Sequence, residues 1–159
     1  MSGSVRPTVL FDLDGTLVDS APDLAGAAND LRVARGLPAL PFGQLRPMVG
    51  AGARGMVGRA FGLGPGDDGF AELRDAFLAL YESRLSRLTA VFADVHPLLD
   101  ALDADGLRWG IVTNKATRFT TPLVSALGLD ARAAAVVCGD TTPHAKPHPA
   151  PLLEAARRI

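Results

Sequence analysis

Strand-like segments are distributed unevenly along this chain, and their placement constrains the fold more than any other feature. Short apolar runs that are typical of β-strands occupy residues 9–13, 109–113 and 136–138. The last two flank a helical segment, residues 120–127, which is followed by Gly128, a residue favoured just after helices. Because strands that alternate with helices form parallel sheets with helices on their faces, we expect an α/β protein.

The long segment between the first two strand-like runs has a helical pattern. Apolar residues recur at helical spacing over residues 24–34 and again over residues 70–85, with no strand signal between them. Ser20 and Asp23 have the spacing of a capping box at the start of the first of these helices. The predicted domains are a core, residues 1–17 and 92–159, and a helical insert, residues 18–91.

Four glycines, Gly50, Gly52, Gly55 and Gly58, lie in a part of this insert whose apolar residues still recur at helical spacing. Each interior glycine costs a helix about 1 kcal/mol relative to alanine. Four of them indicate a close backbone approach, an anion site at a helix start or a segment that moves, and a poorly formed loop is the ordinary alternative.

Two carboxylates, Asp12 and Asp14, come after the apolar run Val9-Leu10-Phe11 at the end of the first predicted strand and before Gly15. Ligands of open α/β sheets bind beyond the carboxyl ends of the strands, where these side chains are expected. Two close carboxylates attract a hard cation such as Mg²⁺, and one can act as a nucleophile while the other transfers protons. An acidic surface turn is the ordinary alternative, and the preceding strand and the following glycine favour a site.

The composition excludes several classes of function. The chain has 159 residues and a formal net charge of −1, which gives no reason to expect a nucleic acid or membrane partner. Its single cysteine, Cys138, cannot form an intramolecular disulfide and is expected to be buried packing. No stretch is long and apolar enough for a membrane span, and residues 1–8 lack the apolar core of a secretion signal. We expect a cytoplasmic protein.

Three segments in order resemble the motifs of the haloacid dehalogenase superfamily. Residues 12–16, Asp-Leu-Asp-Gly-Thr, resemble its first motif, Thr113-Asn114 its second, and Lys146-Pro147 its third. A helical insert straight after the first motif also fits, and segments 52–54 and 109–115 are similar to the phosphoglycolate phosphatase-like branch that includes N-acetylmuramic acid 6-phosphate phosphatases. The resemblance implies a Rossmann-like core with an inserted helical cap.

The resemblance also implies roles for individual residues. Asp12 would attack phosphorus to form an aspartyl-phosphate, and Asp14 would act as general acid and then as general base. The Asp12 carboxylate and the Asp14 carbonyl would bind Mg²⁺, and Lys146 would supply positive charge to the reacting groups. The implied phosphate-binding residues are Thr113, Asn114 and Gly15.

The chain departs from the family pattern near its end. Relatives continue into a further strand that carries more acidic metal ligands, whereas this chain ends at Ile159. We therefore expect a C-terminally incomplete core with little activity by itself. Asp140 precedes Lys146 and is not assigned to the metal, and Lys115 is interpreted as a solvated neighbour of the site.

The expected function is a Mg²⁺-dependent phosphatase of a small phosphorylated metabolite, 2-phosphoglycolate or a sugar phosphate such as N-acetylmuramic acid 6-phosphate. Arg54 is the first candidate to bind a substrate carboxylate, ahead of Arg46 and Arg59 in the same insert. A β-phosphoglucomutase-like phosphomutase and an inert binding module that retains the fold stay open as alternatives. The expected state is a monomer or homodimer.

Overall fold

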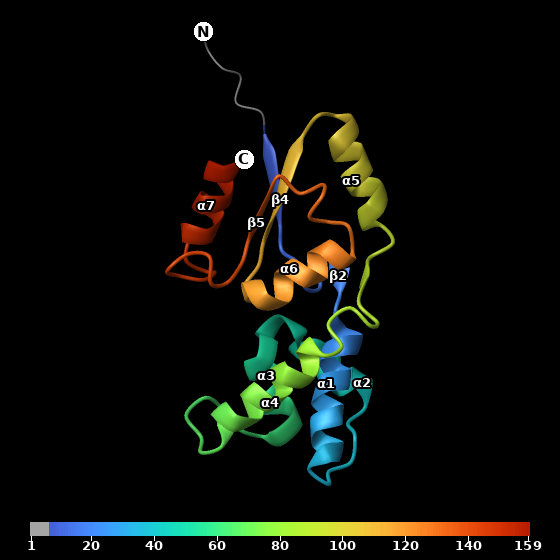
Figure 1. Cartoon of the computed structure of the whole chain (residues 1–159), viewed down its shortest axis with the longest axis vertical. Coiled ribbons are helices and arrows are strands. Elements are labelled where there is room, and N and C mark those ends of the chain that lie inside the picture. The colour runs from blue at the N-terminus through green and yellow to red at the C-terminus, as the bar shows by residue number, and fades with distance from the viewer. Residues whose placement is uncertain (1–6) are drawn as a thin grey trace. The chain divides into compact units, whose positions relative to one another are not determined.

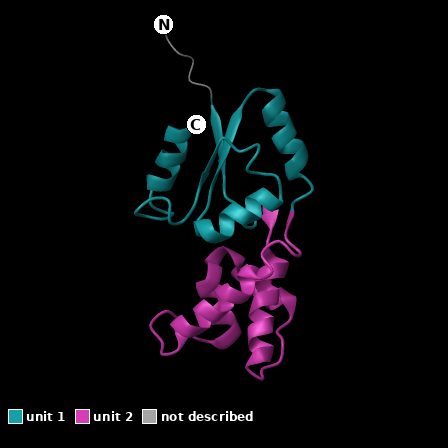
Figure 2. Ribbon diagram, viewed as in Figure 1, with its two compact units in different colours: residues 1–17, 91–159 teal, residues 18–90 magenta. Residues whose placement is uncertain are grey.

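The computed structural model describes residues 7–159, which divide into two compact units (Figure 2). Unit 1 contains the described residues up to Leu17 together with Val91–Ile159, and unit 2 is the segment Val18–Ala90 between them. The expectation about a secretion signal concerns residues 1–8, of which residues 1–6 lie outside the described part of the chain.

Unit 1 is built on a parallel sheet of three strands, β1 (Thr8–Phe11), β4 (Arg108–Val112) and β5 (Ala135–Val137), in the order β1-β4-β5. The central strand β4 is buried from Trp109 onward because it has a partner strand on each side. Each predicted strand is present, displaced by about one residue. The α/β fold class predicted from the sequence is confirmed.

Helices cover both faces of this sheet (Figure 1). The helices α5 (Val95–Ala104) and α6 (Thr117–Ala126) each precede the next parallel strand, and both steps run in the same direction across the sheet. Right-handed crossovers in one direction place both helices on one face. The helix α7 (Ala150–Arg158) lies on the other face, where its fully buried Ala155 packs with Val112 and Val137.

The strand register determines where the polar residues after each strand emerge. Phe11 pairs with Ile111, and Val112 pairs with Val137, so the carboxyl ends of all three strands lie at one edge of the sheet. The segments that follow these strands begin at Asp12, Thr113 and Cys138. This edge is where open parallel sheets bind their ligands.

Unit 2 is helical, and its core is formed by apolar faces of three helices that pack against one another. The glycine-rich segment is helical and not a poorly formed loop, since Gly50 lies in η1 and Gly52, Gly55 and Gly58 lie in α3. Beside this unit's helices, two short strands, β2 and β3, pair in a separate sheet. The elements are β2 (Val18–Asp19), α1 (Ala21–Ala34), α2 (Phe42–Leu45), the 3₁₀ helix η1 (Arg46–Ala51), α3 (Gly52–Phe61), α4 (Phe70–Glu82) and β3 (Ala90–Val91).

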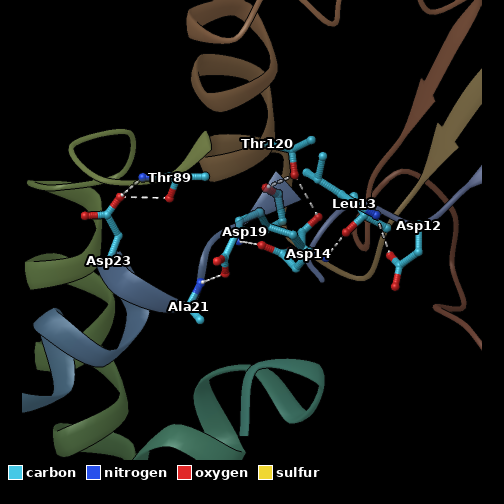
Figure 3. A network of polar contacts seen from close by, with 11 residues as sticks. Asp12, Leu13, Asp14, Asp19, Ala21, Asp23, Thr89 and Thr120 are labelled. Carbon is cyan, nitrogen blue, oxygen red and sulfur yellow. Dashed lines mark hydrogen bonds and ion pairs between the residues drawn. The ribbon is translucent and has the colours of Figure 1, made fainter. Parts of the chain in front are cut away.

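The predicted capping box at the start of α1 is wrong. Ser20 makes no side-chain cap bond, and Asp23 is fully buried in contact with residues far along the chain. One carboxylate oxygen of Asp23 accepts a hydrogen bond from the amide of Leu88 at 2.8 Å. The same oxygen accepts the amide and the hydroxyl of Thr89 at 2.7 and 2.8 Å (Figure 3). The other oxygen lies 3.6 Å from Nε of Arg84. Asp23 therefore ties the beginning of unit 2 to its end.

Two further expectations from composition can be compared with the structure. Cys138 is buried directly after β5, as a packing residue should be. Within residues 7–159, every helix is too short or too polar to cross a bilayer.

Candidate active site

The first candidate residues lie in the tight turn that follows β1. Leu13 is completely buried, and its carbonyl accepts hydrogen bonds from the amides of Thr16 and Leu17 at 3.2 and 3.0 Å. Gly15 has a φ of +76°, a conformation that costs other residues about 1–2 kcal/mol. The buried Leu13 and the glycine turn thus hold Asp12 and Asp14 at the carboxyl end of the strand.

Asp12 is held through one of its two carboxylate oxygens. Its Oδ1 accepts the amide N–H of Leu13 at 2.8 Å (Figure 3) and lies 3.0 Å from Nζ of Lys146. No described residue donates a hydrogen bond to Oδ2, and 47% of the side chain is exposed. This carboxylate is oriented by two donors and keeps one oxygen for a ligand.

Lys146 reaches Asp12 from a loop far away in the sequence. Its ammonium group donates to the carbonyl of Val112 at 2.7 Å as well as contacting Asp12, so it bridges the ends of β1 and β4. The predicted association of Lys146 with the first aspartate is therefore present in the structure.

Asn114 fixes the backbone of that lysine. Its amide nitrogen donates to the carbonyl of Lys146 at 2.9 Å, and its amide oxygen accepts the N–H of Lys146 at 2.8 Å. This pair of bonds makes Asn114 a clamp for the loop that carries Lys146. Phosphate binding by Asn114 stays a prediction, and it would have to use the remaining amide hydrogen.

Thr113 occupies the first position after β4 and is buried. Its hydroxyl oxygen accepts the amide N–H of Lys115 at 3.1 Å, and its own amide donates to the carbonyl of Val137. The hydroxyl hydrogen has no acceptor among the described residues, so the group can still donate to an anion, as the prediction requires.

Lys115 belongs to the site, and its interpretation as a solvated neighbour is wrong. Its Nζ donates to Oδ1 of Asp14 at 2.8 Å, and the two side chains are only 9% and 16% exposed. The sequence contains a signal for this role that the motif pattern does not use. Lys115 and Lys146 are the only lysines in the chain, where every other basic side chain apart from histidine is arginine.

Asp140 lies at the same edge of the sheet but stabilises a helix. Its Oδ1 accepts the hydroxyl of Thr117 at 2.5 Å and the amide of Thr117 at 2.9 Å, so it caps the start of α6. The hydroxyl, and then the amide, hold the pKa of the Asp140 carboxyl below its usual value. The exclusion of Asp140 from the metal site stays a prediction, as these contacts engage only its Oδ1.

Gly139 allows two loops of the site to approach each other closely. Its amide donates to the carbonyl of Lys115 at 2.9 Å, and a Cβ added at this position would lie within 3.0 Å of the backbone of Asn114. The substitution Gly139→Ala should therefore push the loop that carries Asn114 and Lys115 away and lower the free energy of unfolding by about 1–3 kcal/mol. Urea unfolding measures this change.

The control for this prediction is Gly43→Ala, because the added methyl group there meets no atom within 4 Å and φ is ordinary. Alanine at position 43 should leave the stability unchanged or raise it slightly, since it restricts the unfolded chain. Equal stabilities of the two variants would show that the approach at Gly139 is not tight in solution.

The three candidate arginines of unit 2 differ in their contacts. Arg46 forms an ion pair with Asp19 at 3.1 Å, and Arg59 donates to the side chain of Gln44. Arg54 is exposed in the first turn of α3, and its guanidinium has no hydrogen bond or ion pair with a described residue. Of the three, Arg54 has the guanidinium least engaged within the protein.

The carboxylate oxygens of this site are ligands that suit a hard divalent cation such as Mg²⁺. No group of three or more His, Cys, Asp or Glu side chains in residues 7–159 could enclose an ion. Mg²⁺ does not need such a cage, because it keeps several waters and binds through one or two carboxylates plus phosphate oxygens. The exposed carboxylate of Asp12 can supply one such oxygen, and Asp14 follows two residues later.

Comparison with known proteins defines the class of this site. Residues 7–159 match the family of haloacid dehalogenase-like hydrolases. The chain belongs to this family, which confirms the resemblance inferred from the three motifs. It is therefore placed among hydrolases with a Rossmann-like core.

Individual relatives within this family are named as phosphatases. The chain is 40% identical over 151 residues to the N-acetylmuramic acid 6-phosphate phosphatase of Pseudomonas putida, covering 95% of this chain and 68% of that protein. It is 44% identical over 160 residues to the phosphoglycolate phosphatase of Xylella fastidiosa. That alignment covers 99% of this chain and 69% of the Xylella protein. A crystal structure of a predicted phosphoglycolate phosphatase from Haemophilus somnus superposes with a TM-score of 0.79 at 31% identity, covering 95% of this chain and 70% of that one.

Proposed function

We propose that this protein is a Mg²⁺-dependent phosphatase that hydrolyses a small phosphomonoester through an aspartyl-phosphate on Asp12. The observation that carries the proposal is the state of the Asp12 carboxylate, which Lys146 and the Leu13 amide hold through one oxygen while the other has no described partner. A carboxylate held in this way can attack phosphorus without first breaking a contact. Relatives at 40–44% identity are named as phosphatases.

The proposed first step transfers the phosphoryl group to the enzyme. Oδ2 of Asp12 forms a bond to phosphorus while the bond from phosphorus to the ester oxygen breaks. Asp14 gives its proton to the departing alkoxide, which leaves as the alcohol. Lys146 and the hydroxyl of Thr113 balance the charge on the phosphoryl oxygens, together with backbone N–H groups near Gly15 and Asn114.

The second step returns the enzyme to its starting state. Asp14, now a carboxylate, accepts a proton from a water molecule whose oxygen bonds to phosphorus as the bond to Asp12 breaks. The products are inorganic phosphate and the free Asp12 carboxylate. A bound Mg²⁺, held by the Asp12 carboxylate and by Asp14, supplies Lewis-acid stabilisation of the phosphoryl group when present.

The proposed substrates are 2-phosphoglycolate and N-acetylmuramic acid 6-phosphate, because relatives carry those names and both compounds contain a carboxylate. We assign recognition of that carboxylate to Arg54. This residue lies in the helical unit, and the family resemblance identifies that unit as a cap. The proposed setting is the cytoplasm, and the proposed state is a monomer or homodimer.

Replacement of Arg54 tests this assignment of specificity. Arg54→Ala should raise KM for an acidic phosphomonoester about 10-fold or more and leave KM for an uncharged alkyl phosphate nearly unchanged, since a guanidinium–carboxylate pair contributes to binding. Arg87→Ala, which also removes an exposed arginine, serves as the control. Equal losses on both substrates would remove Arg54 from this role.

Trapping with beryllium fluoride tests the proposed function without turnover. Beryllium fluoride binds aspartate carboxylates as an analogue of the phosphoryl group, so with Mg²⁺ it should raise the thermal unfolding midpoint of the protein. The Asp12→Asn variant should show no such increase. An inert binding module would give no increase in either protein, and release of inorganic phosphate from the substrate would exclude a phosphomutase.

A further inference from the structure

The two lysines of this chain are both used at the candidate site. The sequence has 16 lysine and arginine residues, and only Lys115 and Lys146 are lysines. Lys146 lies 3.0 Å from Asp12, and Lys115 lies 2.8 Å from Asp14, so each aspartate of the first motif has its own ammonium partner. Lysine offers a compact charge that can contact a single carboxylate oxygen, whereas arginine presents a wide planar fork.

We propose that Lys115 is a positioning residue that orients Asp14 for proton transfer, an inference that rests on the proposed phosphatase function. The contact connects the turn after β1 with the segment after β4, two neighbouring strands of the sheet. Both side chains are largely buried, which makes their pairing more specific than that of the exposed ion pairs elsewhere in the chain.

The backbone of Lys115 is fixed from three directions. Its amide donates to the hydroxyl of Thr113 at 3.1 Å, and its carbonyl accepts the amide of Gly139 at 2.9 Å and the hydroxyl of Thr120 at 3.2 Å. A lysine anchored in this way delivers its ammonium group to a defined place. The loops after β4 and β5 and the helix α6 therefore all contribute to the position of the Asp14 carboxylate.

The pairing also engages one defined oxygen of Asp14. An ammonium group only donates hydrogen bonds, so Oδ1 of Asp14 is an acceptor of Lys115. This contact limits the rotation of the carboxyl group and so sets its direction. In the first step Asp14 gives a proton to the ester oxygen as the bond from that oxygen to phosphorus breaks, and in the second step the Asp14 carboxylate takes a proton from water.

This role predicts a dependence on the leaving group that a phosphate-binding or purely structural lysine would not show. An alkyl phosphate needs the proton of Asp14 because an alkoxide is a poor leaving group, whereas p-nitrophenyl phosphate releases a stable phenolate without it. The measurement is the rate of alcohol or phenol release in the first turnover, with wild-type protein and Lys115→Met at saturating substrate and Mg²⁺.

Lys115→Met should slow first-turnover release from the alkyl phosphate by about 10–100-fold and release from p-nitrophenyl phosphate by less than about 3-fold. Lys115→Arg should recover part of the loss on the alkyl phosphate. In an Asp14→Asn background, Lys115→Met should cause no further loss on the alkyl ester. Arg157→Met, which removes an exposed cation from α7, is the matched control and should leave both rates unchanged.

Equal losses on the two esters would overturn the inference, because they would place Lys115 on the phosphate or in the fold rather than on Asp14. If Lys115→Met does not fold, as judged by its thermal unfolding, Lys115→Gln gives the same comparison with a neutral donor retained. Absence of first-turnover release from both esters, together with no rise in the thermal unfolding midpoint of the wild-type protein on adding beryllium fluoride and Mg²⁺, would contradict the proposed function itself. Activity on both esters with equal losses in the variant would contradict only the role of Lys115.

Discussion

The substitution Asp12→Asn should lower kcat for a phosphomonoester by at least about 10⁴-fold, because it replaces the attacking carboxylate with a neutral amide. An amide has the size of the carboxylate but is a poor nucleophile, and its nitrogen cannot bind a hard cation. The Leu13 amide can still donate to the amide oxygen, so the turn after β1 should keep its conformation. Steady-state phosphate release measures the change.

The control for this variant is Asp105→Asn, at an exposed residue that follows α5. It makes the same chemical change away from the candidate site and should retain full activity. Circular dichroism and thermal unfolding of Asp12→Asn should match those of the wild-type protein. Activity within tenfold of the wild type in a folded Asp12→Asn variant would contradict the assignment of the nucleophile.

The second large effect is expected for Lys146→Met, which should lower kcat about 10²–10³-fold. Two interactions are lost at once, since the ammonium group lies 3.0 Å from Asp12 and donates to the carbonyl of Val112 at 2.7 Å. Without it, the negative charges of the nucleophile and the phosphate repel each other with no ammonium group beside Asp12. Single-turnover measurement of the phosphorylation rate isolates this step from product release.

Asn114→Leu provides an independent check on the same lysine. It removes the two hydrogen bonds that hold the backbone of Lys146, at 2.9 and 2.8 Å, and leaves the ammonium group in the protein. We expect a smaller loss of kcat than for Lys146→Met. If Asn114→Leu were the more damaging of the two, phosphate binding by the Asn114 amide would be its main role instead of the clamp.

The sequence predicts the sheet well because its strands are short apolar runs that end in distinctive polar residues. The strand that ends before Asp12 and the strand that ends before Thr113 are both present with a shift of about one residue. The end of α6 was equally readable from the glycine that marks it, since Gly128 has a φ value of +69°. Such features depend on neighbouring residues in the chain, which a single sequence displays directly.

Contacts between distant residues were not predictable in the same way. Asp23 has the local spacing of a helix cap, but its carboxylate bonds to Leu88 and Thr89, more than sixty positions along the chain. Nothing in its own segment indicates those partners. The partner of Lys115 was equally hard to predict, because Asp14 is 101 residues away along the chain. Only the rarity of lysine in this chain sets Lys115 apart from its neighbours in the sequence.

The site therefore divides into residues that motifs identify and residues that only the fold identifies. Asp12 and Lys146 come from motifs, and the structure places them in contact. Gly139 and the clamp by Asn114 are visible only when the loops after β4 and β5 are seen together. The motif residues carry the proposed chemistry, and the other two set the positions of the groups that perform it.

The most direct test of the proposed mechanism is to quench the protein in acid during turnover of a phosphomonoester with Mg²⁺ and to map the modified peptide by mass spectrometry. The account predicts a single added phosphoryl group on the peptide that contains Asp12, and none on the same peptide of Asp12→Asn. Turnover without that adduct, or with a phosphoryl group on a different residue, would contradict it.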